Sequence, residues 1–146
     1  MGWITKASNE RNAARQQRDL LAQKAPALWD NICRDIEETV KEYGRSGGGE
    51  FIVESTGPAN HTIWVWVFES KTPREKGPER ERVTFSFNQE KLAVEVNSSL
   101  GTSKVFLIAL NAAGNACLMD GNKEIPVDKF TEITLRDAFF PTSASG

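Results

Sequence analysis

A one-sided apolar stripe between residues 28 and 43 constrains the fold of this chain more than any other feature. Its large apolar side chains recur at helical spacing: Leu28, Trp29, Ile32, Cys33, Ile36, Val40 and Tyr43. At about 100° per residue they fall within an arc of roughly 140°, and charged and amide side chains fill the other side. Such a helix has one face to bury, so another element must cover it. The strand-rich sequence that follows is the expected cover, which predicts an α+β fold.

Length and charge narrow the class of protein. The 146 residues suit one domain over residues 1–146 with a single sizeable core. The formal net charge of −2 gives no overall field that would attract nucleic acid or a membrane surface. No apolar run approaches the ~20 residues of a bilayer span, and the first residues lack the apolar region of a signal peptide. We therefore expect a cytoplasmic protein.

The segment 1–44 is predicted to be helical with an interruption near Pro26. Residues from about 5 to 24 are rich in Ala, Arg, Gln and Leu and contain neither Gly nor Pro. Proline suits the first turn of a new helix and disrupts a helix interior, so we expect either two helices or one kinked helix. Gly44 is a suitable C-cap, and residues 45–49 should then form a flexible connector.

Between residues 50 and 127 the apolar period changes to two, which predicts strands. Most connections are too short for crossover helices, so we expect a five- to six-stranded antiparallel meander with the helical segment on one face. The charged segment 71–82, which contains two prolines, is expected to be a solvated hairpin loop. The strongest strand, residues 62–69, is apolar on both faces, with Trp64, Trp66 and Phe68 on one and Ile63, Val65 and Val67 on the other.

Residues 128–140 allow two interpretations. Ile133 alternates with polar neighbours as in a strand, whereas Asp128 as an N-cap would start a short helix. On that helix Phe130, Ile133 and Phe140 would share one face. Because residues 136–140 are not strand-like, we favour the short helix. Residues 141–146 are predicted to be a frayed tail.

Patterns that would support catalysis or metal binding are scarce. Cys33 and Cys117 lie in apolar patterns and are expected to be buried thiols. His61, the only histidine, falls in a turn and is expected to be an ordinary surface residue. No pair of His or Cys residues has metal-ligand spacing, and residues 47–49 lack the flanking residues of a phosphate loop. We expect no cofactor, no metal and no catalytic residues.

Trp64 and Trp66 project to the same face of their strand, about 7 Å apart. The favoured interpretation places them in the core beneath the helix, near Trp29. One alternative is an exposed aromatic platform. Another is a pocket between the curved sheet and the helix, lined by Trp64, Trp66 and Phe85, in which a small molecule would bind or react.

On the N-terminal side of Pro26 the stripe changes from apolar to basic. Arg11, Arg15 and Arg18 lie on the same angular track as the core residues. Three arginines cannot sit unpaired in a dry core, so the first helix must extend beyond the sheet, turn away from it or meet an acidic partner. Residues 1–24 carry five positive and two negative groups, whereas residues 25–44 carry two positive and five negative. Antiparallel pairing of two copies would set the arginines against the acidic segment.

The sequence therefore favours a non-enzymatic binding or protein-interaction module, with Arg11, Arg15 and Arg18 as its interaction surface. A protein partner or a second copy, forming a homodimer, is the expected occupant. Small-molecule binding or catalysis in the tryptophan-lined pocket is the alternative, and weak nucleic-acid binding ranks third. Nucleic acid is not expected because the charged segment 71–82 has no interleaved aromatic residue to stack on bases. No membrane partner is expected.

Overall fold

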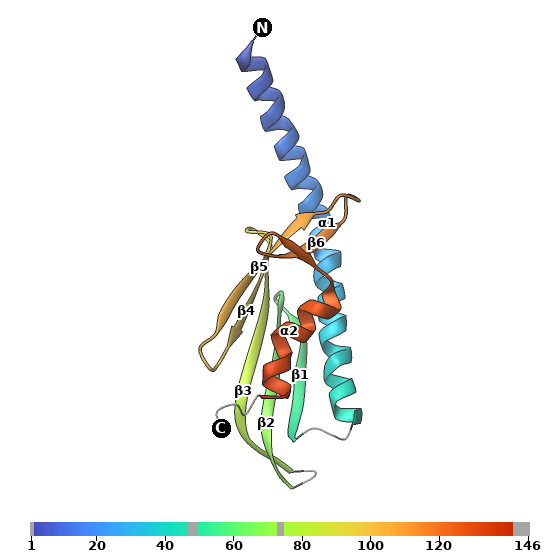
Figure 1. The fold of residues 1–146 in the computed structure, drawn as a ribbon, viewed down its shortest axis with the longest axis vertical. Coiled ribbons are helices and arrows are strands. Elements are labelled where there is room, and N and C mark those ends of the chain that lie inside the picture. The colour runs from blue at the N-terminus through green and yellow to red at the C-terminus, as the bar shows by residue number, and fades with distance from the viewer. Residues whose placement is uncertain (1, 47–49, 73–74, 142–146) are drawn as a thin grey trace.

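The computed structural model describes residues 2–46, 50–72 and 75–141. A long helix is followed by a sheet and then by a short helix, which confirms the α+β class (Figure 1). The sheet has seven described strands rather than the five to six expected. The elements are α1 Trp3–Ser46, β1 Phe51–Ala59, β2 Thr62–Thr72, β3 Glu75–Asn88, β4 Ala93–Ser98, β5 Ser103–Leu110, β6 Ala116–Asp120, β7 Lys123–Ile125 and α2 Val127–Phe139.

The sheet is an antiparallel meander, as predicted, in which spatial order follows chain order from β1 to β7. Both helices pack on one face of it. Trp29 of α1 stacks on Phe87 of β3 with ring centroids 5.8 Å apart. Phe130 of α2 meets Phe85 at 5.9 Å and Phe106 at 4.9 Å, both edge-on. These side chains and the apolar face of α1 form one continuous core.

The stripe from residue 28 to residue 43 is buried, as predicted. α1, however, is a single helix that runs through Pro26 and ends at Ser46, so the predicted division of this segment into two helices and the predicted C-cap at Gly44 are both wrong. Proline has no N–H to donate to the carbonyl four residues earlier. That carbonyl belongs to Ala22, which is exposed, so water can satisfy it and the helix need not end.

The predicted loop at residues 71–82 is wrong, because β2 continues to Thr72 and β3 begins at Glu75. Register shifts between these strands mark bulges that accommodate the irregular sequence. At the other end of β2 a tight turn joins it to β1. Asn60 and His61 both have positive φ, 54° and 57°, which matches the two-residue turn that joins twisted strands.

The short C-terminal helix is confirmed as α2, but the face predicted for it is wrong. Pro126 occupies the N-cap and Asp128 lies in the first turn. Ile133 and Phe140 are exposed, at 39% and 59%. The residues of α2 that are buried against the sheet and α1 are a different set: Phe130, Thr131, Leu135, Ala138 and Phe139.

The predicted connector at 45–49 is wrong at residues 45 and 46, which belong to α1, and its residues 47–49 lie outside the described residues, as does the predicted tail from residue 142. Within the described chain, no helix combines the length and apolar character needed to cross a membrane.

Candidate functional site

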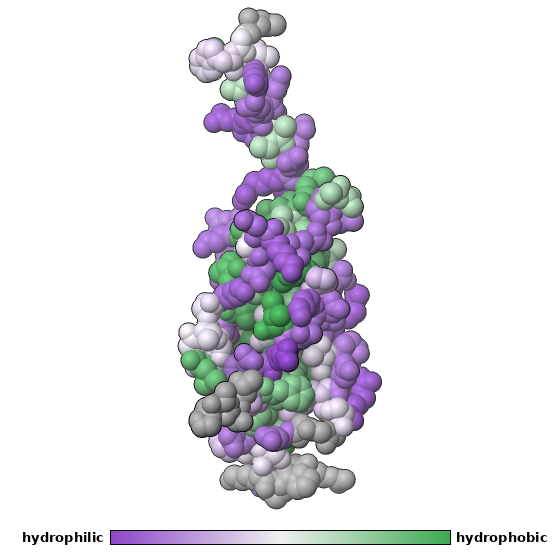
Figure 2. Space-filling view, in the orientation of Figure 1, coloured by the Kyte–Doolittle hydropathy of each residue, from purple (hydrophilic) through white to green (hydrophobic). Residues whose placement is uncertain are grey.

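The N-terminal half of α1 extends beyond the sheet as a helical arm, residues 3–24 (Figure 1). Every residue from 3 to 20 is exposed, and the buried residues of α1 begin at Ala25. At 1.5 Å per residue the arm is about 33 Å long. In Figure 2 it is a narrow stalk whose visible surface is mostly hydrophilic. Of the three alternatives predicted for the basic track, extension beyond the sheet is the one observed.

The arm is helical without a sheet to pack on because it continues a helix that is already formed. Nucleation is the costly step of helix formation, and the packed half of α1 supplies it. Ala, Arg, Gln and Leu, which dominate the arm, are the residues with the best intrinsic helix propensity. The arm is therefore ordered by propensity and by its attachment rather than by tertiary contacts.

The three predicted arginines have different surroundings. Arg18 donates from Nη2 to the backbone carbonyl of Glu90, at 2.8 Å, in the turn between β3 and β4. No hydrogen bond or ion pair joins Arg11 or Arg15 to another residue of the described chain. Beyond them, Trp3 and Ile4 are 78% and 66% exposed. The arm thus presents free positive charge and large apolar side chains together.

A groove of about 400 Å³ lies where the arm leaves the sheet. Its lining is mostly apolar and includes Leu107, a strand leucine that is 56% exposed. Arg18 and Lys91 bring positive charge to its lining. The lining residues come from the arm, the turn after β3 and the end of β5: Ala14, Gln17, Arg18, Leu21, Lys91, Leu92, Leu107, Ile108, Ala109 and Leu110. We call this the basal groove.

Sequence reasoning missed the basal groove because its two sides are far apart in the chain. Arg18 and Glu90 meet only through the tertiary fold. One signal was available: the segment that became β5 is apolar on both faces, although only one face meets the helices. Val105 and Leu107, on the outward face, are 54% and 56% exposed.

The predicted tryptophan-lined pocket is wrong. In the register of β2 and β3, Ile63 lies opposite Phe85 and Trp64 lies opposite Thr84, so Trp64 and Phe85 are on opposite faces of the sheet. Phe85 is fully buried beneath the helices, as are Ile63, Val65 and Val67. Trp64 and Trp66 are partly exposed on the other face and do not pack near Trp29. Both faces of β2 are apolar, so the pattern alone did not identify the buried one.

On the outward face of the sheet the aromatic rings are already covered in part by the chain's own cations. Trp66 stacks on Phe68 with centroids 6.3 Å apart and planes inclined by 3°. The Arg82 guanidinium lies 4.9 Å from the centre of the Trp66 ring, and Lys76 Nζ lies 4.5 Å from that of Phe68. Lys76 is also paired with Glu54 at 3.2 Å. These contacts account for the aromatic cluster as local packing.

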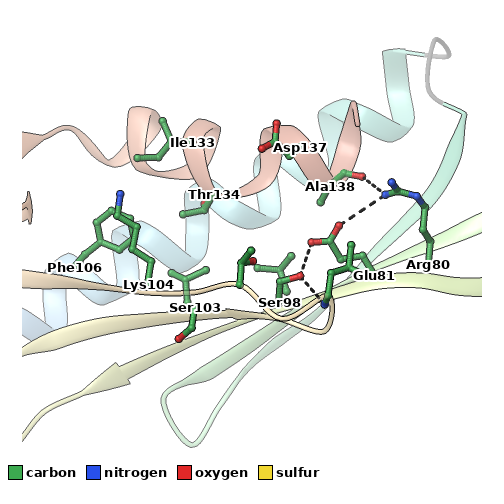
Figure 3. Close-up of a pocket in the computed structure, with 14 residues that line it drawn as sticks. Arg80, Glu81, Ser98, Ser103, Lys104, Phe106, Ile133, Thr134, Asp137 and Ala138 are labelled. Carbon is green, nitrogen blue, oxygen red and sulfur yellow. Dashed lines mark hydrogen bonds and ion pairs between the residues drawn. The ribbon is translucent and has the colours of Figure 1, made fainter. Parts of the chain in front are cut away.

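A second cavity, of about 420 Å³, lies between α2 and strands β3 to β5 (Figure 3). Its most buried charged side chain is Glu81, 8% exposed, whose Oε2 accepts a 2.7 Å hydrogen bond from Ser98 Oγ. Arg80 Nη1 lies 3.8 Å from Glu81 Oε1 and donates to the Ala138 carbonyl at 3.5 Å. A bulge between Val67 and Phe68 adds one residue to β3, which turns both Arg80 and Glu81 toward α2.

The charged groups around this cavity mainly hold the structure together. Lys104 Nζ is paired with Asp120 at 3.0 Å, and Glu81 is held by Ser98 and Arg80. Thr134 points from α2 toward the sheet, whereas Asp137 projects away from it (Figure 3). The cavity therefore offers an apolar floor with one buried carboxylate. Its lining contains neither a histidine nor a cysteine.

Neither cysteine has the surroundings of a nucleophile. Burial raises the pKa of the Cys33 thiol to about 12, with a further increase from Asp30 and Glu37. Burial, followed by Glu124, also raises the pKa of Cys117. His61 is exposed in its turn and meets the edge of Phe87 at 5.6 Å. Over the described residues, no group of three or more His, Cys, Asp or Glu side chains is placed to hold a metal ion.

No protein-family model matches this chain, and neither a curated protein nor a solved structure matches it. Function must therefore be argued from the geometry of the molecule. Two places combine an accessible surface with distinctive chemistry: the arm with its basal groove, and the cavity beneath α2.

Proposed function

We propose that this protein is a non-enzymatic interaction module that engages a protein partner through its helical arm. The observation that carries the proposal is the continuous exposure of residues 3–20 on a formed helix. Most helices in proteins gain their stability by packing one face against the rest of the fold. An arm that is already helical can dock without the entropic cost of folding on its partner.

The apolar residues of the arm give it something to gain from docking. Trp3 and Ile4 are the most exposed large apolar side chains of the described chain. Burying such a side chain contributes about 1.5–3 kcal/mol relative to leaving it in water. Trp and Arg are also the residue types that most often dominate binding energy at protein interfaces, and the arm carries both.

Site-specific photo-crosslinking in cells tests the proposal. A photoreactive side chain replaces Ala14, on the arm, or Ala27, an exposed alanine on the packed half of the same helix. We expect one discrete protein adduct from position 14 and none from position 27. No adduct at position 14, or equal adducts at both positions, would overturn the proposal. The mass of the adduct also tells a second copy from a different protein.

Small-molecule binding beneath α2 is the second candidate function. The buried carboxylate of Glu81, together with the 420 Å³ cavity beside it, supports it. A bound ligand should raise the melting temperature, and Val96→Trp, which places an indole at a buried lining position, should abolish that shift in a variant whose circular dichroism matches the parent. A panel of small amines and polyols that produces no saturable shift would rule against this candidate.

A further inference from the structure

We infer that the partner of the arm is an acidic amphipathic helix of another protein, which lies along the arm and ends over the basal groove. This inference rests on the proposed function, since it names the chemistry of what the arm engages. Three features of the described chain support it: the alternation of small and basic residues on the arm, the unbalanced charge, and the continuity of the arm with the groove.

One line of the arm alternates small or apolar residues with arginine. Steps of three and four residues, the spacing of a helix–helix seam, join Ile4, Ala7, Arg11, Ala14, Arg18 and Leu21. Alanine at two positions lets a second helix approach closely and leaves room for large apolar side chains from it. The arginines beside those positions would lie against the partner's flanking residues. The complementary surface is a helix with leucine-like residues in its seam and carboxylates beside them.

The charge of this surface is not balanced within the chain. Arg11 and Arg15 make no ion pair with a described residue, and the groove adds Lys91 and Arg18 to the same region. The arm itself carries five basic and two acidic groups. Several positive charges brought against a neutral or basic surface would repel it or lose solvation, so the partner must supply carboxylates.

The groove extends the apolar part of the same surface. Its lining begins on the arm at Ala14 and continues to Leu21, so a helix lying on the arm reaches it directly. There Leu107, 56% exposed, would be covered by an apolar side chain of the partner. Lys91 and Arg18, also in the lining, would face the acidic residues that follow that side chain.

A second copy of this chain does not fit these requirements. α1 is one continuous helix, and of the exposed acidic residues on its packed half Glu38 and Glu42 point roughly 150–170° away from the mean direction of the three arginines, and Asp30 about 90° away. An antiparallel copy contacts one side of the helix along its length, so it cannot meet both sets. Pairing two arms alone would bring together ten basic groups and four acidic ones. The predicted homodimer therefore lacks a complementary surface.

The test uses the full chain and a synthetic probe. The probe is a labelled peptide of about three heptads, with leucine at the two seam positions and glutamate at the flanking positions. Its control has lysine in place of every glutamate. We expect the acidic peptide to bind, with an affinity that falls about tenfold between about 50 and 500 mM salt because screening weakens exposed charge pairs. The lysine peptide should not bind.

Two pairs of variants locate the contact. Arg11→Glu/Arg15→Glu should weaken binding by about 30-fold, since two attractions become two repulsions. Arg34→Glu/Arg45→Glu, at exposed arginines of the packed half, should change it less than about twofold. Leu107→Ser should weaken binding about fivefold, whereas Val105→Ser, equally exposed on the same strand but outside the groove, should leave it unchanged.

The inference is overturned if the acidic peptide fails to bind, if the lysine peptide binds equally, or if the Arg11→Glu/Arg15→Glu variant binds as the parent does. The crosslinking experiment separates this failure from that of the proposed function. A heterologous adduct at position 14 without peptide binding keeps the arm as a docking site and removes the acidic helix. An adduct of twice the chain's mass makes a second copy the partner, which also removes it.

Discussion

The two halves of α1 form one helix for different physical reasons. Residues 25–46 bury a stripe against the sheet, with Ala25, Ile32 and Ile36 fully inaccessible. Residues 3–24 bury almost nothing and remain helical through propensity and through attachment to the packed half. Continuity of a helix therefore does not show how far a core extends. The two halves share a conformation, but only one of them contributes much to the stability of the fold.

Two basic side chains mark the boundary between the halves. Lys24 donates from Nζ to the backbone carbonyl of Gly114, before β6, and Arg18 donates to that of Glu90, after β3. Both reach from the helix to loops at the same end of the sheet. They hold the helix at its point of exit and set the direction in which the arm leaves. On the N-terminal side of Arg18, no described side chain of the arm forms a hydrogen bond or an ion pair with the rest of the described fold.

The largest expected difference in the free energy of unfolding is between alanine variants of the two tryptophans of α1. Trp29 is 4% exposed and stacks on Phe87, so Trp29→Ala should lower the free energy of unfolding by about 3–5 kcal/mol. Trp3 is 78% exposed, so Trp3→Ala should change it by less than about 0.5 kcal/mol. Equilibrium urea unfolding measures both. A large cost for Trp3→Ala would mean that the arm is packed in the isolated protein and that both halves of α1 stabilise the fold.

A substitution at Pro26, where the two halves of α1 join, should stabilise the protein instead of destabilising it. Pro26→Ala restores the N–H that the Ala22 carbonyl lacks and removes the steric cost of proline in a helix interior. We expect the free energy of unfolding to rise by about 1–3 kcal/mol. Hydrogen exchange of arm amides should slow at the same time, because the arm is then attached to the packed half more firmly. Unchanged stability and exchange would show that Pro26 is not a weak point.

Alkaline pH should affect the packed half through Cys33. Burial raises the pKa of its thiol from 9.0 to about 12, so the unfolded chain loses this proton at lower pH than the folded chain does. The contribution of the buried neutral thiol to the free energy of unfolding is present below about pH 9. It is lost between about pH 9 and 12, at about 1.4 kcal/mol per pH unit. Urea unfolding of the parent and of Cys33→Ala at several pH values isolates it. An identical slope in the two proteins would contradict the expectation.

The smallest expected difference in the free energy of unfolding is between alanine variants of two arginines of the arm. Arg18→Ala removes the exposed hydrogen bond to Glu90 and should cost about 0.5–1 kcal/mol in unfolding free energy. Arg15→Ala removes no described contact and should cost less than about 0.3 kcal/mol. Thermal unfolding of the two variants side by side is sensitive enough to rank them. Equal costs would mean that Arg18 does not hold the arm at its exit from the sheet.

The elements predicted correctly were those whose sequence pattern allows only one structural interpretation. The stripe from Leu28 to Tyr43 is apolar on one side only, and the connections between strands are too short for anything but a meander. The face of β2 could not be predicted because Trp64 and Ile63 are both apolar, and only pairing with Phe85 decides between them. The strand residues at 71–72 and 75–82 were missed because the charged side chains in that part of the sequence hide the alternation.

Part of the candidate site could be predicted from the sequence and part of it could not. Arg11, Arg15 and Arg18 could be predicted as a surface because charge cannot be buried unpaired, whatever the fold. The basal groove could not, because Leu107 becomes part of it only when the end of β5 is brought beside Leu21. Which side of a helix a strand approaches is a property of the whole packing, and no local pattern contains it.

The strand order has a consequence for how the chain folds. Each strand pairs with the next one along the chain, so the sheet can grow hairpin by hairpin without closing a long loop. α2 follows the whole sheet, and its Phe130 sits between Phe85 and Phe106. During synthesis, the sheet can therefore pair before its apolar face is sealed. The interval before α2 emerges is the time when this protein most needs protection from aggregation.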